Sequence, residues 1–398
     1  MTKNKLKMVV AAGLLCAVGT AHAQIRPAYA YPAPATGGTQ IGGSPVFFTP
    51  WVGAGVGYDD NLFLTPSNEK SSPFYVLSPG LRLDARSPHS VIQLSHQHQW
   101  GYYSDSHADD YMDHTTRGVA DMAFSPRMFG RVGFDYVKGH DPRGSTDRPV
   151  STTPDEYKIF SPNATFAYGA PGAQGRAEVY YSFLRKRYDN NRSTTQFSDR
   201  DQQEYGAALY LRVAPKTYVL GEVRWTDIDY KIFQPQFSGQ EQRYYFGVSW
   251  EATAATTGTL KYGRLKRDFD SGEESSHNSW EGIVTWTPRT YSRLDFYTSR
   301  QTNESTGQGR FILTSVAGVS WTHDWSSVLM TGVNLRYQKD EYQGFNREDE
   351  TKSLGLRVGY KMRRWLTLGA EYTFAQRDSN LNFDYDKNFY LLTATISP

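Results

Sequence analysis

The sequence predicts a transmembrane β-barrel of about eighteen antiparallel strands in an up-and-down order. Three observations predict this fold: a short apolar segment at the N-terminus, an aromatic-rich composition, and alternating apolar and polar residues from residue 46 onward. The chain has 28 Tyr, 21 Phe and 35 Gly, but only 38% of its 398 residues are hydrophobic. A water-filled barrel tolerates this composition because only its exterior must be apolar.

Residues 1–23 have the features of a secretory signal peptide. Three lysines precede an apolar run over residues 8–19, and Ala21-His22-Ala23 predicts cleavage before Gln24. The only cysteine, Cys16, lies in this segment, so we expect no disulfide and no thiolate chemistry in the mature chain. Residues 24–45 are rich in Pro and Gly and are expected to form a flexible periplasmic lead-in to a barrel over residues 46–398.

The barrel segments are about 10–14 residues long, as expected for strands that cross an outer membrane. No blade signature recurs at a fixed period of roughly 40–50 residues, which argues against a propeller. An even number of strands places both ends of the barrel on the same side, and we expect that side to be the periplasm. The predicted strands begin near Phe47, Pro73, Ser90, Thr115, Met128, Tyr157, Gly175, Gln203, Thr217, Gln242, Gly258, Ser279, Thr290, Phe311, Ser327, Thr351, Trp365 and Lys387.

The connections between these segments alternate in length. Eight are tight turns, such as Ser125-Pro126-Arg127 and Pro288-Arg289, and they are expected to face the periplasm. Nine are expected to be longer external loops, including 59–72, 104–114, 140–155, 188–202 and 340–350. A β-sandwich would not alternate its turn lengths so regularly.

The period of two residues assigns a face to each side chain. Leu356, Val358 and Tyr360 would contact lipid, while Arg357 between them would face the lumen. A charge on the lipid side costs about 2–4 kcal/mol at mid-membrane, so charged strand residues are expected to point inward. They either contact a solute or form ion pairs that stabilise the wall. The lumen-lining candidates are Arg82, Asp84, Arg131, Asp135, Arg212, Glu222, Arg224, Tyr245, Glu251, Arg293, Asp295, Tyr297, Arg336, Arg357 and Glu371.

Two predicted external loops carry clustered polar residues. Such groups bind calcium or sugar in some proteins, but their spacing fits no defined metal loop, and a solvated loop explains them better. His96 and His98 share one strand face, yet zinc would need further ligands from neighbouring strands. We therefore expect no resident metal and no cofactor. The external-loop candidates are Asp59, Asp60, Asn61, Asp109, Asp110, Asp113 and His114.

Nucleic-acid binding and catalysis have no support in the sequence. The formal net charge is only +2, so no polyelectrolyte partner is indicated. The sequence has no Gly-x-Ser-x-Gly nucleophile elbow, and no other motif joins its serines and acids to a histidine. We therefore expect a protein that is not an enzyme.

Residues 46–140 resemble the β-barrel porin family that includes the EpsL-like proteins of exopolysaccharide operons. Three stretches carry the resemblance: Phe47-Phe48-Thr49-Pro50 with the following Gly57 to Phe63, Leu77 to Asp84, and Asp109 to His114. Beyond residue 140 only the barrel pattern continues. The resemblance implies an outer-membrane pore through which an exopolysaccharide or capsular polysaccharide passes to the cell surface.

The expected partners follow from this resemblance and from the fold. They are the polysaccharide, outer-membrane lipid, a periplasmic polysaccharide export protein and the barrel assembly machinery. An uptake porin for small solutes or oligosaccharides shares every physical feature described so far and is the alternative. Inward tyrosines such as Tyr245 and Tyr297 are expected to stack on sugar rings in either case.

Overall fold

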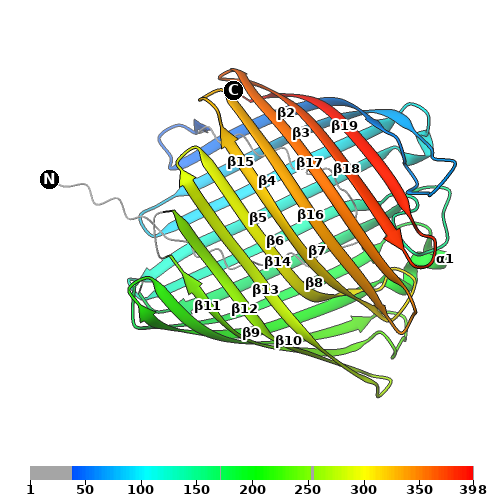
Figure 1. Ribbon diagram of the computed structural model, residues 1–398. Helices are drawn as coiled ribbons and strands as arrows, with labels where there is room; N and C mark the ends of the chain where they lie inside the picture. Colours follow the sequence, from blue (N-terminus) through cyan, green and yellow to red (C-terminus); the bar gives the residue numbers. More distant parts are fainter. Residues whose placement is uncertain (1–37, 171, 252–254, 398) are drawn as a thin grey trace.

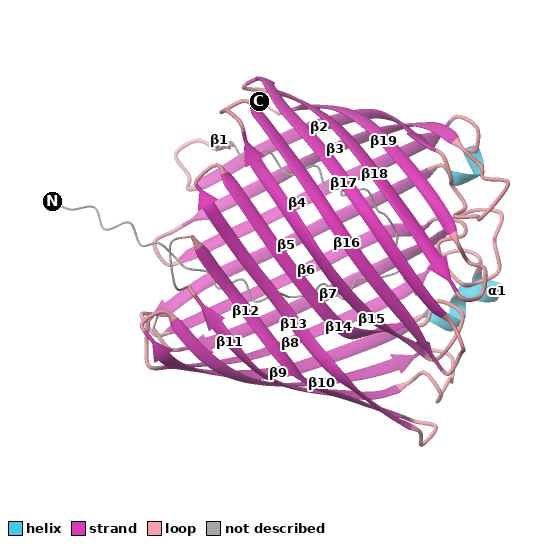
Figure 2. Ribbon diagram, viewed as in Figure 1, coloured by secondary structure: helices cyan, strands magenta, loops and turns pink. Residues whose placement is uncertain are grey.

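The alternating segments form eighteen long strands that close into one antiparallel barrel, shown in Figures 1 and 2. The computed structural model describes residues 38–170, 172–251 and 255–397. Each strand pairs with its neighbours in sequence, and β19 pairs with β2 to complete the ring. The strands are β2 (Val46–Asp59), β3 (Ser72–Arg86), β4 (Ser90–Tyr103), β5 (Tyr111–Ser125), β6 (Met128–Asp141), β7 (Asp155–Tyr168), β8 (Gly175–Tyr188), β9 (Arg200–Ala214), β10 (Thr217–Tyr230), β11 (Gly239–Trp250), β12 (Thr256–Phe269), β13 (Glu274–Arg289), β14 (Ser292–Glu304), β15 (Phe311–Asp324), β16 (Leu329–Gln343), β17 (Glu348–Arg363), β18 (Leu366–Ser379) and β19 (Tyr385–Ile396).

The predicted fold class and strand number are confirmed, and each predicted strand matches an observed one. Both ends of the barrel, Val46 and Ile396, lie at the end that carries the short turns. A two-residue strand, β1 (Thr39–Gln40), pairs with β2 inside the segment that was expected to be a flexible lead-in. The predicted signal peptide lies outside the described residues. Within the described ranges, no helix is long and apolar enough to cross a membrane.

Several predicted boundaries were wrong. The long loops are shorter than predicted, because strand pairing extends into them: the expected loop 340–350 is reduced to residues 344–347. Three short helical elements lie in two of the long loops: η1 (His107–Asp109) between β4 and β5, and α1 (Arg192–Thr195) and η2 (Gln196–Ser198) between β8 and β9. The long-loop end of the barrel, called the mouth below, is therefore tightly built.

The two faces of the wall differ as the two-residue period predicts. On β9, Leu209, Leu211 and Val213 are 63%, 58% and 61% exposed on the outer face. Large apolar side chains are exposed in this way around the barrel, an arrangement that lipid would stabilise and water would not. The inner face carries most of the buried polar residues, including Glu222 on β10 and Asp84 on β3.

Candidate functional site: the lumen and its mouth

Most of the predicted lumen charges lie on the inner face and pair with one another. Arg82 Nε lies 2.6 Å from Asp84 Oδ2, and Asp84 also accepts a hydrogen bond from Gln93 at 2.7 Å. Arg293 Nε lies 2.8 Å from Asp295. At these positions the wall presents neutralised pairs rather than free charges. Arg357 and Glu371 form a looser pair at 3.3 Å across β17 and β18.

Arg131 and Asp135 lie on the same face, but each pairs with a residue of β5 that the sequence analysis missed. Arg131 binds Asp121 through two hydrogen bonds of 2.6 and 2.9 Å, and Arg117 lies 2.6 Å from Asp135. These pairs join residues that are directly opposite in the β5–β6 ladder. The strand period alone could have placed Arg117 and Asp121 on this face.

Glu222 and Arg224 belong to a larger buried ion cluster. Arg224 donates two hydrogen bonds to Glu281 at 2.6 and 2.9 Å, although two strands lie between β10 and β13. Lys261 of β12 lies 2.9 Å from Glu222 and also contacts Glu281. Arg224 and Lys261 also lie over the ring of Tyr245 on β11. The cluster therefore connects the four consecutive strands β10 to β13 on the inner face of the barrel.

Tyr245 is consequently not free to stack on a sugar. It is only 4% exposed, and its hydroxyl forms a 2.7 Å hydrogen bond with Ser279. Tyr297 is more accessible, and its hydroxyl accepts a long hydrogen bond of 3.4 Å from Asn334. The prediction of a stacking surface thus remains for Tyr297 and was wrong for Tyr245.

Of the remaining lumen candidates, Arg336 lies at mid-strand, while Arg212 and Glu251 lie near an end of the wall. Arg336 faces inward beside Gln338, with which it forms a hydrogen bond. Arg212 lies at the short-turn end, where its guanidinium donates to the carbonyl of Gly172. Glu251 was placed wrongly, because β11 ends at Trp250 and Glu251 is an exposed turn residue whose amide donates to Lys216 at 2.8 Å.

Three of the external-loop candidates stabilise the barrel seam instead of forming an open ligand site. Asp59 lies 2.7 Å from Lys387 Nζ, and Asp60 accepts hydrogen bonds from the backbone and side chain of Asn388 at 2.7 and 2.8 Å. Asn61 is fully buried and donates to the carbonyl of Asp386 at 2.9 Å. These contacts join the start of the first long loop to β19.

The other external-loop candidates do not converge on one point. Asp109 binds Arg143 at 2.7 Å, and Asp110 accepts a hydrogen bond from the amide of Tyr103 at 2.7 Å. Asp113 and His114 were expected in the loop but lie in β5, which begins at Tyr111. As adjacent strand residues they point to opposite faces.

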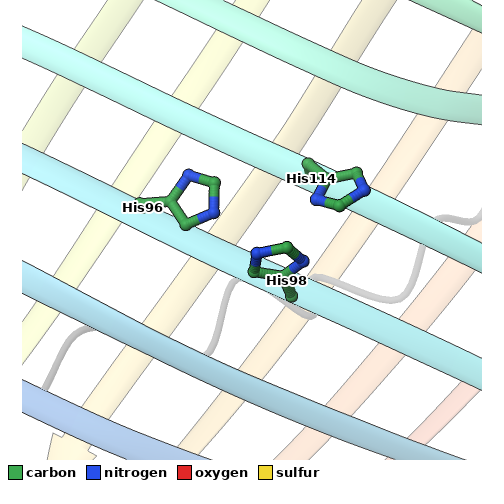
Figure 3. A group of neighbouring side chains, drawn as sticks. All are labelled: His96, His98 and His114. Carbon is green, nitrogen blue, oxygen red and sulfur yellow. The ribbon is translucent and has the colours of Figure 1, made fainter.

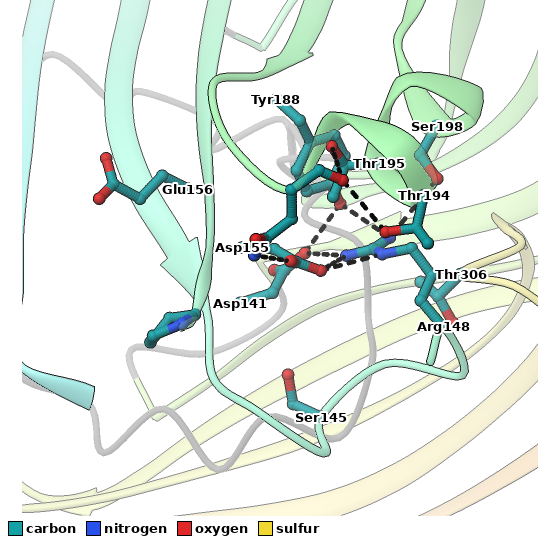
Figure 4. A network of polar contacts seen from close by, with 12 residues as sticks. Asp141, Ser145, Arg148, Asp155, Glu156, Tyr188, Thr194, Thr195, Ser198 and Thr306 are labelled. Atoms are coloured by element: carbon teal, nitrogen blue, oxygen red, sulfur yellow. Dashed lines mark hydrogen bonds and ion pairs between the residues drawn. The ribbon is translucent and has the colours of Figure 1, made fainter. Parts of the chain in front are cut away.

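A long connection between β6 and β7, residues 142–154, is the main feature of the mouth and is called the crossing loop here. Its base is fixed by Arg148, which is 7% exposed. Arg148 binds Asp155 at 2.8 and 3.0 Å and Asp141 at 3.1 Å, and its guanidinium lies 4.6 Å from the ring centre of Tyr188. Figure 4 shows these side chains gathered around Arg148.

The crossing loop also contacts loops on other parts of the rim. Arg143 lies 4.5 Å from the ring centre of Phe63, which belongs to the β2–β3 loop. Gly144 has φ +76°, and a Cβ atom there would lie 2.0 Å from the Phe63 carbonyl oxygen. Only glycine therefore fits this close approach.

Asp147 carries the crossing loop over to the far side of the mouth. Its carboxylate lies 2.8 Å from Arg347, in the β16–β17 loop, and accepts a 2.9 Å hydrogen bond from Thr306, in the β14–β15 loop. The β6–β7 and β16–β17 loops are about half-way around the ring from each other. The contact therefore spans the opening. Arg347 is held in turn by Asp349 and by the ring of Phe383, 3.9 Å away.

The tip of the β14–β15 hairpin bends inward to meet the crossing loop. β14 pairs with β13 only as far as Arg300, although its pairing with β15 continues to Glu304. Glu304 binds Arg267 of β12 at 2.9 and 3.0 Å and accepts a 2.7 Å hydrogen bond from Tyr230 of β10. Buried charged partners thus hold the tip over the lumen.

The two arginines at the mouth are charged at all physiological pH values. Burial opposes the charge on Arg148, but Tyr188, Asp141 and Asp155 outweigh it and raise its pKa above the ordinary value. Burial likewise opposes the charge on Arg347, yet its hydrogen bond to Asp349 and the charge of Asp147 raise its pKa. Both guanidinium groups are therefore permanently available for the ion pairs of the crossing loop.

The match to a family model agrees with the fold. The sequence model of a family described as "Putative beta-barrel porin 2" matches residues 34–397. No curated protein matches the chain.

Among solved structures, OpdK of Pseudomonas aeruginosa is 10% identical, with 88% of this chain and 99% of that chain covered at a TM-score of 0.49. OccK5 (OpdH) of the same organism is 12% identical at a TM-score of 0.48, with 88% of this chain and 98% of that chain covered. The FrpB iron transporter from Neisseria meningitidis (F3-3 variant) is 12% identical at a TM-score of 0.43, with 83% of this chain covered, and the chain spans only 62% of its length.

Proposed function

The chain belongs to this beta-barrel porin family and is a barrel of the bacterial outer membrane, and from this premise we propose that it is a gated pore for the outward passage of a polysaccharide. The observation that carries the gating is the crossing loop, which reaches from Arg148 on one side of the mouth to Arg347 on the other. Passage then requires the contacts of Asp147 to break.

The chemistry of the inner wall supports a hydroxyl-rich cargo. Most of its assigned charges are paired, as in Arg82–Asp84 and Arg293–Asp295, so a long solute meets little net charge. Paired charges and inward hydroxyls offer many weak, exchangeable hydrogen bonds, and conduction needs such repeated weak binding rather than one tight site. The direction of transport and the export partner in the periplasm rest on the resemblance of residues 46–140 to the EpsL-like proteins.

Deletion of the gene in the native strain tests the direction of transport. We expect the mutant to lose surface polysaccharide and to regain it when the wild-type chain is supplied. A mutant with the wild-type amount of surface polysaccharide would overturn export. If that mutant also grew poorly on an oligosaccharide that the parent strain uses, the proposal of export would be replaced by the alternative, an uptake porin.

A reversible crosslink of the crossing loop tests the gate. Thr306 Oγ1 lies 2.9 Å from Asp147 Oδ2, so Asp147→Cys and Thr306→Cys together place two thiols within reach of a short thiol crosslinker. The only cysteine of the sequence, Cys16, lies in the predicted signal peptide and should not interfere. We expect the crosslinked double variant to export no polysaccharide and the same strain, after cleavage of the linker, to export it.

The single variant Asp147→Cys is the matched control for the crosslink. It lacks the ion pair with Arg347 and cannot be crosslinked to Thr306, so we expect it to export whether or not the reagent is present. Normal export by the crosslinked double variant would show that the crossing loop does not have to move.

A further inference from the structure

We propose that His96, His98 and His114 form a binding site for a divalent transition-metal ion of the zinc, nickel or copper class on the outer face of the barrel. Figure 3 shows the three rings gathered at one place over two neighbouring strands. One ligand nitrogen from each ring lies within 4.8 Å of the other two, so small rotations of the rings bring the three to a common ion. The strand period alone had placed only His96 and His98 together.

Strand pairing supplies the third ligand. His98 of β4 is directly opposite His114 of β5, and His96 is opposite Thr116. The ring centres of His98 and His114 are 4.2 Å apart, and those of His96 and His98 are 4.6 Å apart. The separation between the His96 and His114 ring centres is 6.4 Å. A rigid two-strand ladder therefore sets the spacing of all three side chains.

The cluster points away from the lumen. His96 and His98 share their face of β4 with Leu94, Trp100 and Tyr102, which are 38%, 38% and 49% exposed on the outside of the barrel. The site is therefore separate from the ion pairs of the inner wall and from the mouth. An ion would reach it from the surroundings of the barrel and not through the pore.

The polar atoms of the cluster have few other partners. His98 Nδ1 is buried and has no hydrogen-bond partner among the residues that the structure describes. His96 Nδ1 lies 2.7 Å from the hydroxyl of Thr116, which can fix the ring so that Nε2 remains free for an ion. A buried imidazole nitrogen without a partner costs free energy, and a bound ion would remove that cost.

The donor set selects the class of ion. Neutral imidazole nitrogens suit zinc, copper and nickel, whereas calcium and magnesium require oxygen ligands. Three protein ligands leave a further position open for water or another small ligand. Lys138 lies opposite His114 in the ladder, on the same outer face, and its Nζ is 3.2 Å from Glu156. Because charged side chains on the outer face are costly in lipid, this part of the wall borders water.

Metal titration of the purified barrel tests the site. The barrel, carrying an affinity tag without histidine, is stripped with a chelator and titrated with zinc against a chromogenic competitor. We expect one zinc ion per barrel and a loss of affinity of at least about 10-fold in His98→Gln. Loss of an outer-shell partner alone typically costs about 10–100-fold, and His98 would be a direct ligand. Copper-loaded protein should show nitrogen hyperfine coupling that weakens in the same variant.

The matched control is His89→Gln, because His89 is an exposed residue of the β3–β4 turn and not part of the cluster. Its zinc affinity should equal that of the wild type, and gel migration with and without heating should show that both variants are folded. Equal affinity in folded His98→Gln would overturn the site and leave the rings as part of the aromatic belt, where His98 stacks on Trp100. A stoichiometry of half a zinc ion per barrel, together with dimers that form only with zinc, would show that two barrels share the ion and would overturn a site formed by one chain.

Discussion

Replacement of Asp147 by asparagine is expected to open the mouth and to raise the permeability of barrel-containing vesicles to small sugars by about 10-fold or more. The substitution keeps the shape of the side chain but leaves Arg347, which is 1% exposed, without one of its carboxylate partners. Breaking a buried ion pair costs about 3–5 kcal/mol, which corresponds to a factor of roughly 10²–10⁴ in the balance between closed and open arrangements. Liposome swelling in isotonic sugar solutions measures the effect.

Asp105→Asn is the matched control for this experiment. Asp105 is an exposed carboxylate in the β4–β5 loop at the same end of the barrel, so its substitution changes the charge of the mouth equally without touching the crossing loop. Its swelling rate should match the wild type. If Asp147→Asn and Asp105→Asn behaved alike, the contact between Asp147 and Arg347 would not hold the mouth closed.

Replacement of Arg224 by methionine is expected to lower the free energy of unfolding by about 3–5 kcal/mol, because it leaves buried carboxylates without their main partner. Glu281 would lose both of its hydrogen bonds from the guanidinium, and of the cations described in this cluster Lys261 would remain opposite Glu222 and Glu281. The midpoint of urea-induced unfolding in detergent micelles, followed by tryptophan fluorescence, measures the loss.

Arg357→Met provides the comparison for Arg224. Its side chain is 39% exposed and its single partner, Glu371, lies 3.3 Å away, so the expected loss is under about 1 kcal/mol. Similar losses in the two variants would mean that the inner wall tolerates unpaired charge everywhere. That result would contradict the buried character assigned to the cluster.

The fold could be predicted almost completely from the sequence because each strand carries its own signal. The alternation of Leu356, Val358 and Tyr360 with polar residues is local, and neighbouring strands pair in sequence order, so no long-range information is needed. The boundaries were less accurate, since polar residues such as Asp113 serve both in loops and in the hydrated end of a strand. For this reason the loops of the mouth are shorter than the sequence predicted.

The candidate site was predictable only in part. The strand period identifies which residues face inward, but partners depend on register, and a one-residue change in register exchanges them. Arg131 therefore pairs with Asp121 and not with Asp135. Contacts that cross strands, such as Arg224 with Glu281, also depend on the curvature of the wall, which the sequence of a single strand does not encode.

The crossing loop and the histidine cluster show the limits of local patterns most clearly. Asp147 and Arg347 are separated by 200 positions and meet only because the ring brings opposite loops together. His114 joins His98 through the pairing of two strands whose intervening loop was predicted too long. Neither feature has a sequence motif.

The seam between β2 and β19 has a consequence for how the barrel assembles. It contains eight backbone pairs, from Phe389 opposite Asp59 to Ile396 opposite Val52, whereas the neighbouring β2–β3 hairpin contains fourteen. The partners at the seam are more than 300 positions apart, so ring closure carries the greatest loop entropy of any pairing in the chain. Hairpins can therefore form early and in any order, but the cylinder becomes complete only when β19 reaches β2, so we expect this encounter to be the final step of folding.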